Sequence, residues 1–179
     1  MTLRARQKLG KYRIERRISE GPIAAVYEAV DTIHGLSVAL KIPHESSMSE
    51  HFLADFKREA RLAHRLEHPN ILPIRDASFI ADRFVIAMPL GERSLASRMR
   101  RRLSTESALK LIDQAVAGVA HAHGANVIHC DIKPDNFILF EGDRLKLTDF
   151  GFSKVAVGTL RASGSGTATS SIRSTSGGP

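Results

Sequence analysis

The sequence is poor in the residues that build cross-links and stacking surfaces. Among its 179 residues there is one cysteine, Cys130, there is no tryptophan, and aromatic residues make up 6%. A lone cysteine excludes an internal disulfide bond and leaves too few thiols for a structural zinc site, which is typical of proteins in a reducing compartment. The scarcity of aromatic rings removes the stacking platform that single-stranded nucleic acid needs.

Long apolar runs are absent as well. No apolar stretch approaches the ~20 residues that a membrane-spanning helix requires, and residues 1–17 (MTLRARQKLGKYRIERR) lack the apolar centre of a secretory signal. We therefore expect a cytoplasmic protein without a membrane segment. The composition, 42% hydrophobic and 25% charged, is that of one globular domain or slightly more.

Positive charge is in excess, with a formal net charge of +7. The arginines crowd into one run, at Arg98, Arg100, Arg101 and Arg102. Such a run attracts the phosphates of nucleic acid or acidic partners. A solvated helix face is the commoner explanation of charged residues, so nucleic acid is not the partner we expect.

The first half of the chain has the pattern of a sheet followed by one helix. Residues 12–42 contain three strand-like segments separated by turns at residues 19–22 and 31–35, which predicts consecutive antiparallel strands. Two further strands are predicted within residues 71–80 and 84–90. Between these groups the spacing becomes helical, with one apolar stripe formed by Phe52, Phe56, Ala60, Ala63 and Leu66.

The second half begins with a long helix. Ser104 is a suitable N-cap and Gly124 a suitable stop, and apolar residues recur between them at helical spacing. We expect this helix to be buried. A strand is predicted at residues 137–140. From Gly158 onward the chain is rich in Gly, Ser and Thr. We predict disorder there, because its few apolar residues cannot offset the entropy lost on ordering.

Four motifs occur in an order that has chemical meaning. They are Val38-Ala39-Leu40-Lys41, Glu59 in the predicted helix, the segment HCDIKPDN at 129–136, and Asp149-Phe150-Gly151. Alone, the first, second and fourth are common in strands, helix surfaces and turns. Together with the eight-residue segment, they resemble the protein kinase family, and the surrounding segments are similar to the eukaryotic-like serine/threonine kinases of bacteria.

This resemblance implies a reaction and its residues. A kinase transfers the γ-phosphate of ATP to a hydroxyl of a protein substrate, here serine or threonine. Lys41 would hold the α- and β-phosphates and pair with Glu59. Asp131 would orient and deprotonate the hydroxyl, and Lys133 would steady the γ-phosphate. Lysine at position 133, followed by proline, is typical of the serine/threonine class.

The resemblance also implies where the cofactor and the nucleotide would lie. Magnesium, or manganese, would bind Asn136 and Asp149. A hinge at Met88, Pro89 and Leu90 would bond adenine through backbone groups, with Leu90 as donor and Met88 as acceptor, because Pro89 has no N–H. The remaining nucleotide-binding positions would be Ser19, Gly21, Val26, Ala39 and Ile138.

Two local departures from the family stand out. In the protein kinase family, the phosphate-covering loop normally has three glycines that let backbone amides approach the phosphates. Here Ser19, Gly21 and Ala24 occupy those positions, and Pro22 removes another N–H. Cys130 replaces an arginine that pairs with a phosphorylated activation loop in many kinases, which predicts a non-RD kinase that is not switched by that route.

We therefore predict an α+β, two-lobe kinase-like fold. Residues 1–11 would form a basic N-terminal arm, residues 12–90 a complete N-lobe (five-stranded antiparallel sheet plus one helix) with the hinge, residues 91–157 a partial helical C-lobe, and residues 158–179 a disordered tail. The family's later elements have no counterpart after Lys154, so the chain resembles a truncated domain, and part of the apolar face between Leu109 and Val119 should be uncovered.

Several alternatives remain open at this stage. The chain is an active kinase, a pseudokinase-like module that binds nucleotide, or an inactive fragment that acts through protein interaction. The ending has two explanations. In the first, the ending results from a frameshift after about Gly166, because DNA that encodes Thr167–Ser170 can encode Gly-Tyr-Ile when it is read one base earlier. In the second, the chain is a short protein with a flexible tail.

Overall fold

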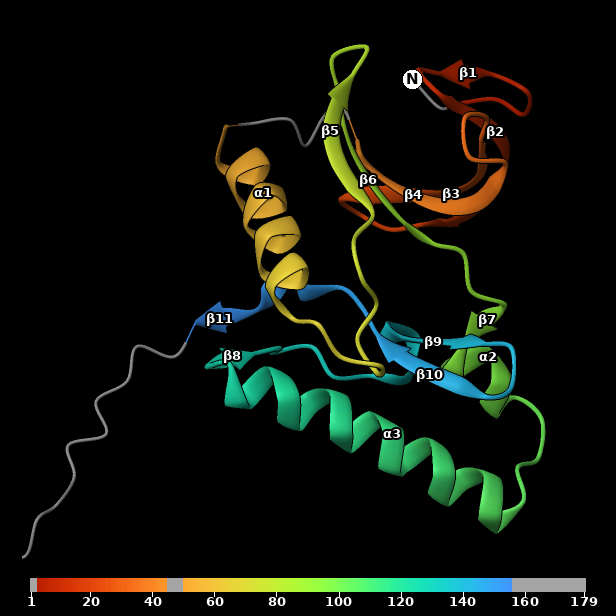
Figure 1. Ribbon diagram of the computed structural model, residues 1–179, viewed down its shortest axis with the longest axis vertical. Helices are drawn as coiled ribbons and strands as arrows, with labels where there is room; N and C mark the ends of the chain where they lie inside the picture. The colour runs from red at the N-terminus through yellow and green to blue at the C-terminus, as the bar shows by residue number, and fades with distance from the viewer. Residues whose placement is uncertain (1–2, 45–49, 156–179) are drawn as a thin grey trace, which may run out of the picture.

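The computed structural model describes residues 3–44 and 50–155, and a strongly curved sheet dominates its first half (Figure 1). The six strands pair antiparallel in the order β1-β2-β3-β4-β6-β5. Their bounds are Lys8–Leu9 (β1), Tyr12–Glu20 (β2), Ala24–Asp31 (β3), Leu36–Pro43 (β4), Asp76–Ile80 (β5) and Arg83–Pro89 (β6). The predicted tail at residues 158–179 lies outside the described residues.

The sheet has one short strand more than the five that the sequence predicts. Strand β1 comes from the segment predicted to be a basic arm, and its Leu9 is buried in the apolar cluster of the sheet. Gly10, with a φ of +56°, makes the turn into β2, and a Cβ atom there would lie 2.8 Å from the Ile80 side chain. A two-residue strand is too short for alternation to reveal it.

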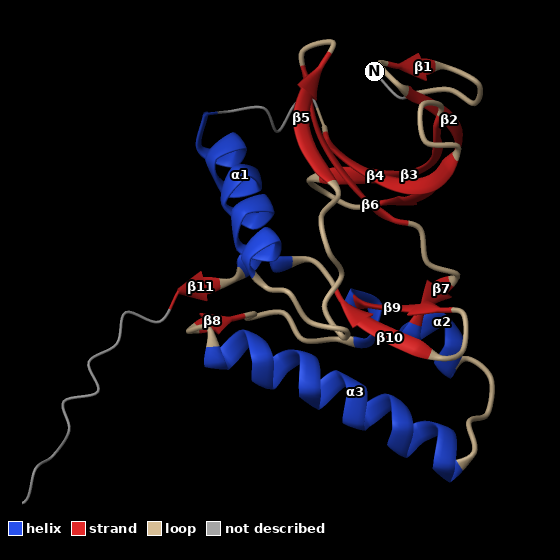
Figure 2. Cartoon of the chain, in the orientation of Figure 1, coloured by secondary structure: helices blue, strands red, loops and turns tan. Residues whose placement is uncertain are grey.

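Helix α1 (Glu50–Arg65) lies beside β5 (Figure 2). The described side chains of its predicted apolar stripe face the protein interior. Phe56, Ala60 and Ala63 are buried, and so is Leu66, one residue after the helix. The spacing of three and four residues puts these side chains on one face. The Phe52 side chain lies outside the described residues.

The second half contains one long helix and small sheets. Helix α3 (Thr105–Gly124) begins where predicted, since the Ser104 side chain accepts a hydrogen bond from the Ser107 N–H. The remaining helices and strands are β7 (Arg93–Ser94), α2 (Leu95–Met99), β8 (Val127–Ile128), η2 (Pro134–Asn136), β9 (Phe137–Phe140), β10 (Arg144–Leu147), η3 (Phe150–Phe152) and β11 (Lys154–Val155). The α+β class is confirmed.

Helix α3 packs on the loop between α1 and β5 through a small residue and an amide. A Cβ atom on Gly118 would lie 2.7 Å from the Asn70 carbonyl oxygen, so a larger residue would push the loop away. The Asn70 side-chain amide donates to Gln114 Oε1 (3.1 Å) and to the Leu145 carbonyl (2.9 Å). These contacts join α3, the loop and β10.

The opposite face of α3 is exposed. Leu109, Ile112 and Val116 are 61%, 58% and 60% exposed, whereas Leu111 is buried. The prediction of a buried helix is therefore wrong for this face, and the expectation of a partly uncovered face is confirmed. Within the described residues, no helix is both long and apolar enough to cross a membrane.

Candidate active site

The site lies where the sheet of the first half meets the hairpin of β9 and β10. Strand β4 carries Lys41 opposite Val26 of β3. The β9–β10 pairing puts Leu147 opposite Phe137, and the Thr148 N–H donates to the Asn136 carbonyl across 2.9 Å. This register brings the end of the segment at 129–136 beside Asp149, although the two are distant in sequence.

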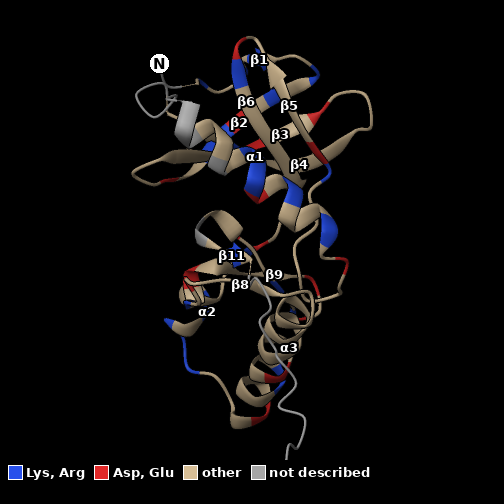
Figure 3. Ribbon diagram, turned by 90° about the vertical axis from the view of Figure 1, so that its left-hand side faces the viewer, with Lys and Arg blue, Asp and Glu red and all other residues tan. Residues whose placement is uncertain are grey.

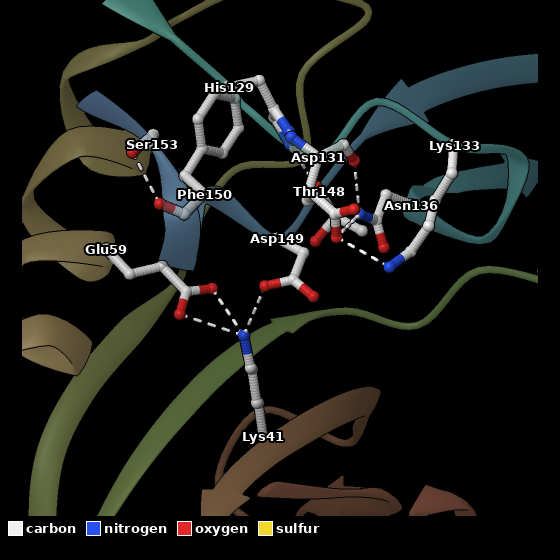
Figure 4. Close-up of polar contacts among 10 residues, drawn as sticks. All are labelled: Lys41, Glu59, His129, Asp131, Lys133, Asn136, Thr148, Asp149, Phe150 and Ser153. Carbon is white, nitrogen blue, oxygen red and sulfur yellow. Dashed lines mark hydrogen bonds and ion pairs between the residues drawn. The ribbon is translucent and has the colours of Figure 1, made fainter. Parts of the chain in front are cut away.

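Lys41 lies between two carboxylates (Figure 4). Its Nζ atom is 2.7 Å and 2.9 Å from the two carboxylate oxygens of Glu59, and 2.9 Å from Asp149 Oδ1. The Lys41 and Glu59 side chains are only 14% and 8% exposed. The structure therefore joins three predicted site residues from β4, α1 and the segment after β10.

The pKa values of Lys41 and Glu59 are both raised in this cluster. Burial acts to lower the pKa of Lys41, but the Glu59 and Asp149 carboxylates outweigh burial, and the pKa is raised above its ordinary value. Burial raises the pKa of Glu59, against the opposing effect of the Lys41 ammonium. Lys41 is therefore a fixed positive charge at neutral pH, held by the protein at a defined position.

A second polar cluster forms around Asp131. Lys133 Nζ lies 2.7 Å from Asp131 Oδ2, and the Asn136 side-chain amide donates to the same oxygen across 2.9 Å and to the Asp131 carbonyl across 2.8 Å. The hydrogen bond from Lys133 is the main cause that lowers the pKa of Asp131. Asp131 is therefore an ionised carboxylate that two neighbours orient.

The two clusters are linked by His129, which the sequence places in the motif without a role of its own. The residue is 1% exposed, and its ring has Nε2 2.9 Å from the Thr148 carbonyl oxygen and Nδ1 3.3 Å from the Asp131 backbone nitrogen. Since a carbonyl only accepts and an N–H only donates, the proton is on Nε2. The ring also meets Phe150 edge-on, with 4.8 Å between centroids.

The backbone at the site is in an uncommon conformation. Cys130 and Asp149 have φ values of +65° and +69°, in the left-handed region that non-glycine residues seldom adopt. The buried neighbours His129 and Phe150 hold both positions in place. Such conformations persist only where the surrounding structure determines them.

Helix α1 is also tied to the segment after Asp149. The Arg58 guanidinium donates to the Ser153 carbonyl, and the buried Ser153 hydroxyl donates to the Phe150 carbonyl across 2.6 Å. A Cβ atom on Gly151 would lie 3.2 Å from Glu59, so glycine allows the close approach. Sequence reasoning missed Arg58 and Ser153, which no motif distinguishes.

The predicted adenine-binding residues are only partly brought together. One apolar cluster contains Val26, Ala39, Met88 and Leu90, and pairing between β4 and β6 puts Ala39 opposite Met88. Ile138 is outside that cluster. Ile138 lies on β9, close to the residue that follows the predicted hinge. A Cβ atom on that residue, Gly91, would be 2.3 Å from the Ile138 side chain.

The predicted phosphate-covering loop is a short turn. Ser19 lies in β2 opposite Val26, and Gly21 begins the three residues that separate β2 from β3. The Gly21 N–H donates to the Ala24 carbonyl across 2.9 Å, so this amide is used inside the turn. Ser19 therefore lies on the sheet that also carries Lys41, and Gly21 lies in the turn that follows β2.

The arginine run lies apart from these clusters, at the end of α2 and in the loop before α3 (Figure 3). Arg100, Arg101 and Arg102 are exposed. None of the four arginines forms an ion pair with a carboxylate in the described part of the chain.

Comparison with known proteins gives one family. The model of the protein kinase domain matches residues 12–172. The chain is 35% identical over 154 residues to the probable serine/threonine-protein kinase pknA2 of Bifidobacterium longum, covering 82% of this chain and 20% of that protein. It is 36% identical over 151 residues to the serine/threonine-protein kinase PrkC of Bacillus subtilis, covering 80% and 23%.

A plant protein is similar to the same extent. The CBL-interacting protein kinase 16 of Oryza sativa subsp. japonica is 35% identical over 149 residues, covering 81% of this chain and 33% of that protein. The chain thus spans a third or less of the length of these relatives.

Proposed function

Because the chain belongs to the protein kinase family, we propose that it carries the nucleotide site and catalytic groups of an ATP-dependent serine/threonine kinase. The reaction is transfer of the γ-phosphate of ATP to a serine or threonine hydroxyl of a protein substrate. Residues 12–90 form the N-lobe and hinge in this proposal, and residues 91–157 form the start of the C-lobe. A cytoplasmic location and a bacterial source stay predictions.

Lys41 is the proposed phosphate-binding cation. Its Nζ donates to Glu59 and Asp149 at 2.7–2.9 Å, so its position is set before a ligand arrives. A pre-positioned charge stabilises the negative charge of a transferring phosphoryl group without reorganisation. Glu59 acts as the partner that keeps the Lys41 side chain extended toward the site.

Asp131 is the proposed acceptor of the substrate hydroxyl proton. Lys133 and Asn136 both contact Asp131 Oδ2, which leaves Oδ1 free of hydrogen bonds to other described residues. A hydroxyl donor can therefore approach Oδ1 while the carboxylate stays oriented. In this proposal Lys133 also supplies positive charge to the γ-phosphate.

The donor set fits a magnesium ion. Asn136 donates through Nδ2, so its carbonyl oxygen remains as a ligand, and Asp149 uses only Oδ1 toward Lys41. The described residues contain no cluster of three His, Cys, Asp or Glu side chains suited to a metal. One carboxylate, one amide oxygen and substrate phosphates form the kind of site that magnesium uses. Bound magnesium would neutralise phosphate charge.

The adenine base is assigned to the apolar cluster at the hinge. Val26 and Ala39 would pack on one face of the ring, and Ile138 on the other. The Met88 carbonyl and the Leu90 N–H would supply the hydrogen bonds, since Pro89 has no N–H. The close approach of Gly91 to Ile138 supports a fixed distance between the hinge and β9.

Regulation is proposed to differ from that of kinases with arginine before the catalytic aspartate. Cys130 is exposed, and its Sγ donates a hydrogen bond to the Ile128 carbonyl across 3.5 Å. A neutral thiol cannot pair with a phosphate as a guanidinium does. Phosphorylation of the activation loop therefore has no charge partner at this position.

The observation that carries the proposal is the double contact of Lys41 with Glu59 and Asp149 beside the oriented Asp131. The test is thermal unfolding of the chain with and without Mg-ATP. At 100 times the dissociation constant, binding should raise the melting temperature by about 5–10 °C. Asp149→Ala should remove the magnesium-dependent shift, whereas Asp113→Ala, an exposed control on α3, should keep it.

A second candidate is a module that binds nucleotide without transferring phosphate. It is favoured by the turn at Gly21, whose N–H is already bonded, and by Pro22, which has none. Incubation with radiolabelled ATP and serine/threonine peptides separates the two. A thermal shift without labelled peptide supports the second candidate, and absence of any shift from the folded chain contradicts both.

A further inference from the structure

The turn between β2 and β3 is held from outside by a single histidine. His44 directly follows β4, and its backbone N–H donates to the Ile23 carbonyl across 2.9 Å. Its ring atom Nε2 lies 2.8 Å from the Gly21 carbonyl oxygen. Because a carbonyl only accepts, Nε2 carries the proton in this contact. One residue therefore binds two of the three carbonyls in the turn.

The sheet register explains why His44 reaches the turn. Ala24, the first residue of β3, pairs with Pro43, the last residue of β4, so the next residue of the chain lies alongside the turn. Lys41 is on the same strand, opposite Val26. The contact from His44 thus fixes the turn relative to the strand that carries the proposed phosphate-binding cation.

Few hydrogen bonds within the turn are available to fix its conformation. Its closing bond runs from the Gly21 N–H to the Ala24 carbonyl. Pro22 offers no N–H, and the outer glycines expected of a phosphate-covering loop are replaced by Ser19 and Ala24. With fewer glycines the turn has less backbone freedom to adjust to a ligand, so contacts from neighbouring residues set its position.

We propose that His44 is a positioning residue for nucleotide binding: it holds the β2–β3 turn over the phosphate region through the Gly21 carbonyl. The inference rests on the proposed function. In this role His44 does not touch the nucleotide. It reduces the number of turn conformations that binding must select, so its loss weakens binding of the phosphates and leaves the adenine contacts at the hinge unchanged.

The experiment compares two ligands and three variants of the 179-residue chain. Mg-ATP and adenosine share the base and the sugar, and only Mg-ATP has phosphates. His44→Ala should weaken Mg-ATP binding about three- to tenfold, the effect of one net hydrogen bond, and leave adenosine binding unchanged. His44→Gln, which restores an N–H donor, should recover part of the loss. His123→Ala, an exposed control on α3, should bind like the wild type.

Hydrogen exchange of the backbone amides gives a readout that needs no ligand. The amides of residues 19–21, 23 and 24 should exchange faster in His44→Ala than in the wild type, with α3 unchanged. Equal exchange in that segment overturns the inference, and so does an equal loss of adenosine and Mg-ATP affinity. If the folded wild type binds no Mg-ATP while the exchange difference is present, the proposed function fails and the structural contact stands.

Discussion

The Nε2 atom of His129 donates a hydrogen bond to the Thr148 carbonyl across 2.9 Å and so joins the segment before Asp131 to the residue before Asp149. The ring is buried, and its Nδ1 accepts from the Asp131 N–H. The two acidic residues of the proposed site are therefore positioned by one imidazole ring.

His129→Ala should destabilise the protein. The substitution leaves the Thr148 carbonyl and the Asp131 N–H without this partner and opens a cavity beside Phe150. We expect the free energy of unfolding to fall by about 2–4 kcal/mol, measured by urea denaturation. The exposed His123→Ala variant should change it by about 0.5 kcal/mol or less. Equal stability of the two variants would show that the buried ring contributes nothing.

Lys41→Met should destabilise the protein more at pH 8 than at pH 5. Without the ammonium, Glu59 stays buried, and its pKa, already raised by burial, rises further. When the pKa of Glu59 is higher in the folded state than in the unfolded state, protonation of Glu59 at low pH stabilises the fold. This stabilisation is lost as the pH rises through the folded-state pKa of Glu59. Removing one partner of a buried pair costs about 3–5 kcal/mol.

Urea denaturation of Lys41→Met at both pH values gives the comparison. The double variant Lys41→Met with Glu59→Gln is the control, because it removes the titrating group and should lose most of the pH dependence. A penalty for Lys41→Met that is the same at pH 5 and pH 8 would contradict the prediction.

Lys133→Met should raise the pKa of Asp131. The hydrogen bond from Lys133 is the main cause of the lowered pKa in the wild type. Without it, the carboxylate binds a proton at higher pH, so the acid limb of the pH profile of kcat/KM should move to higher pH. NMR titration of the Asp131 carboxyl group measures the same change without turnover.

The matched control for that experiment is Lys110→Met. Lys110 contacts Glu106 on the surface of α3 at 2.7 Å, far from Asp131 in the sequence. Its loss should leave the Asp131 titration unchanged. An Asp131 pKa that is the same in the Lys133 variant and the wild type would refute the assigned cause.

Polar substitutions on the exposed face of α3 should reduce self-association. The variant with Leu109, Ile112 and Val116 all changed to Gln removes an apolar face that water contacts in the wild type. We expect less aggregate in light scattering, with a small change in unfolding free energy per site. Leu111→Gln, at a buried position of the same helix, should instead lower stability by several kcal/mol. Unchanged aggregation would contradict a role of this face.

Local patterns alone predicted much of the chain. Alternating residues gave the long strands, the stripe from Phe56 to Leu66 gave α1, and Ser104 gave the start of α3, because each depends on neighbours in sequence. The same applies to the four motifs, whose order indicated the family that the domain match confirms.

Only the tertiary structure decided how these pieces meet. The contact between Lys41 and Asp149 joins residues 108 positions apart. Lys41 comes from β4 of the six-stranded sheet, and Asp149 follows β10 of the three-stranded sheet, so the contact depends on how the two sheets pack. Strand β1 and the His44 contact have no periodic pattern that marks them. The sequence determined which side chains were available, and packing between distant segments determined which of them touch.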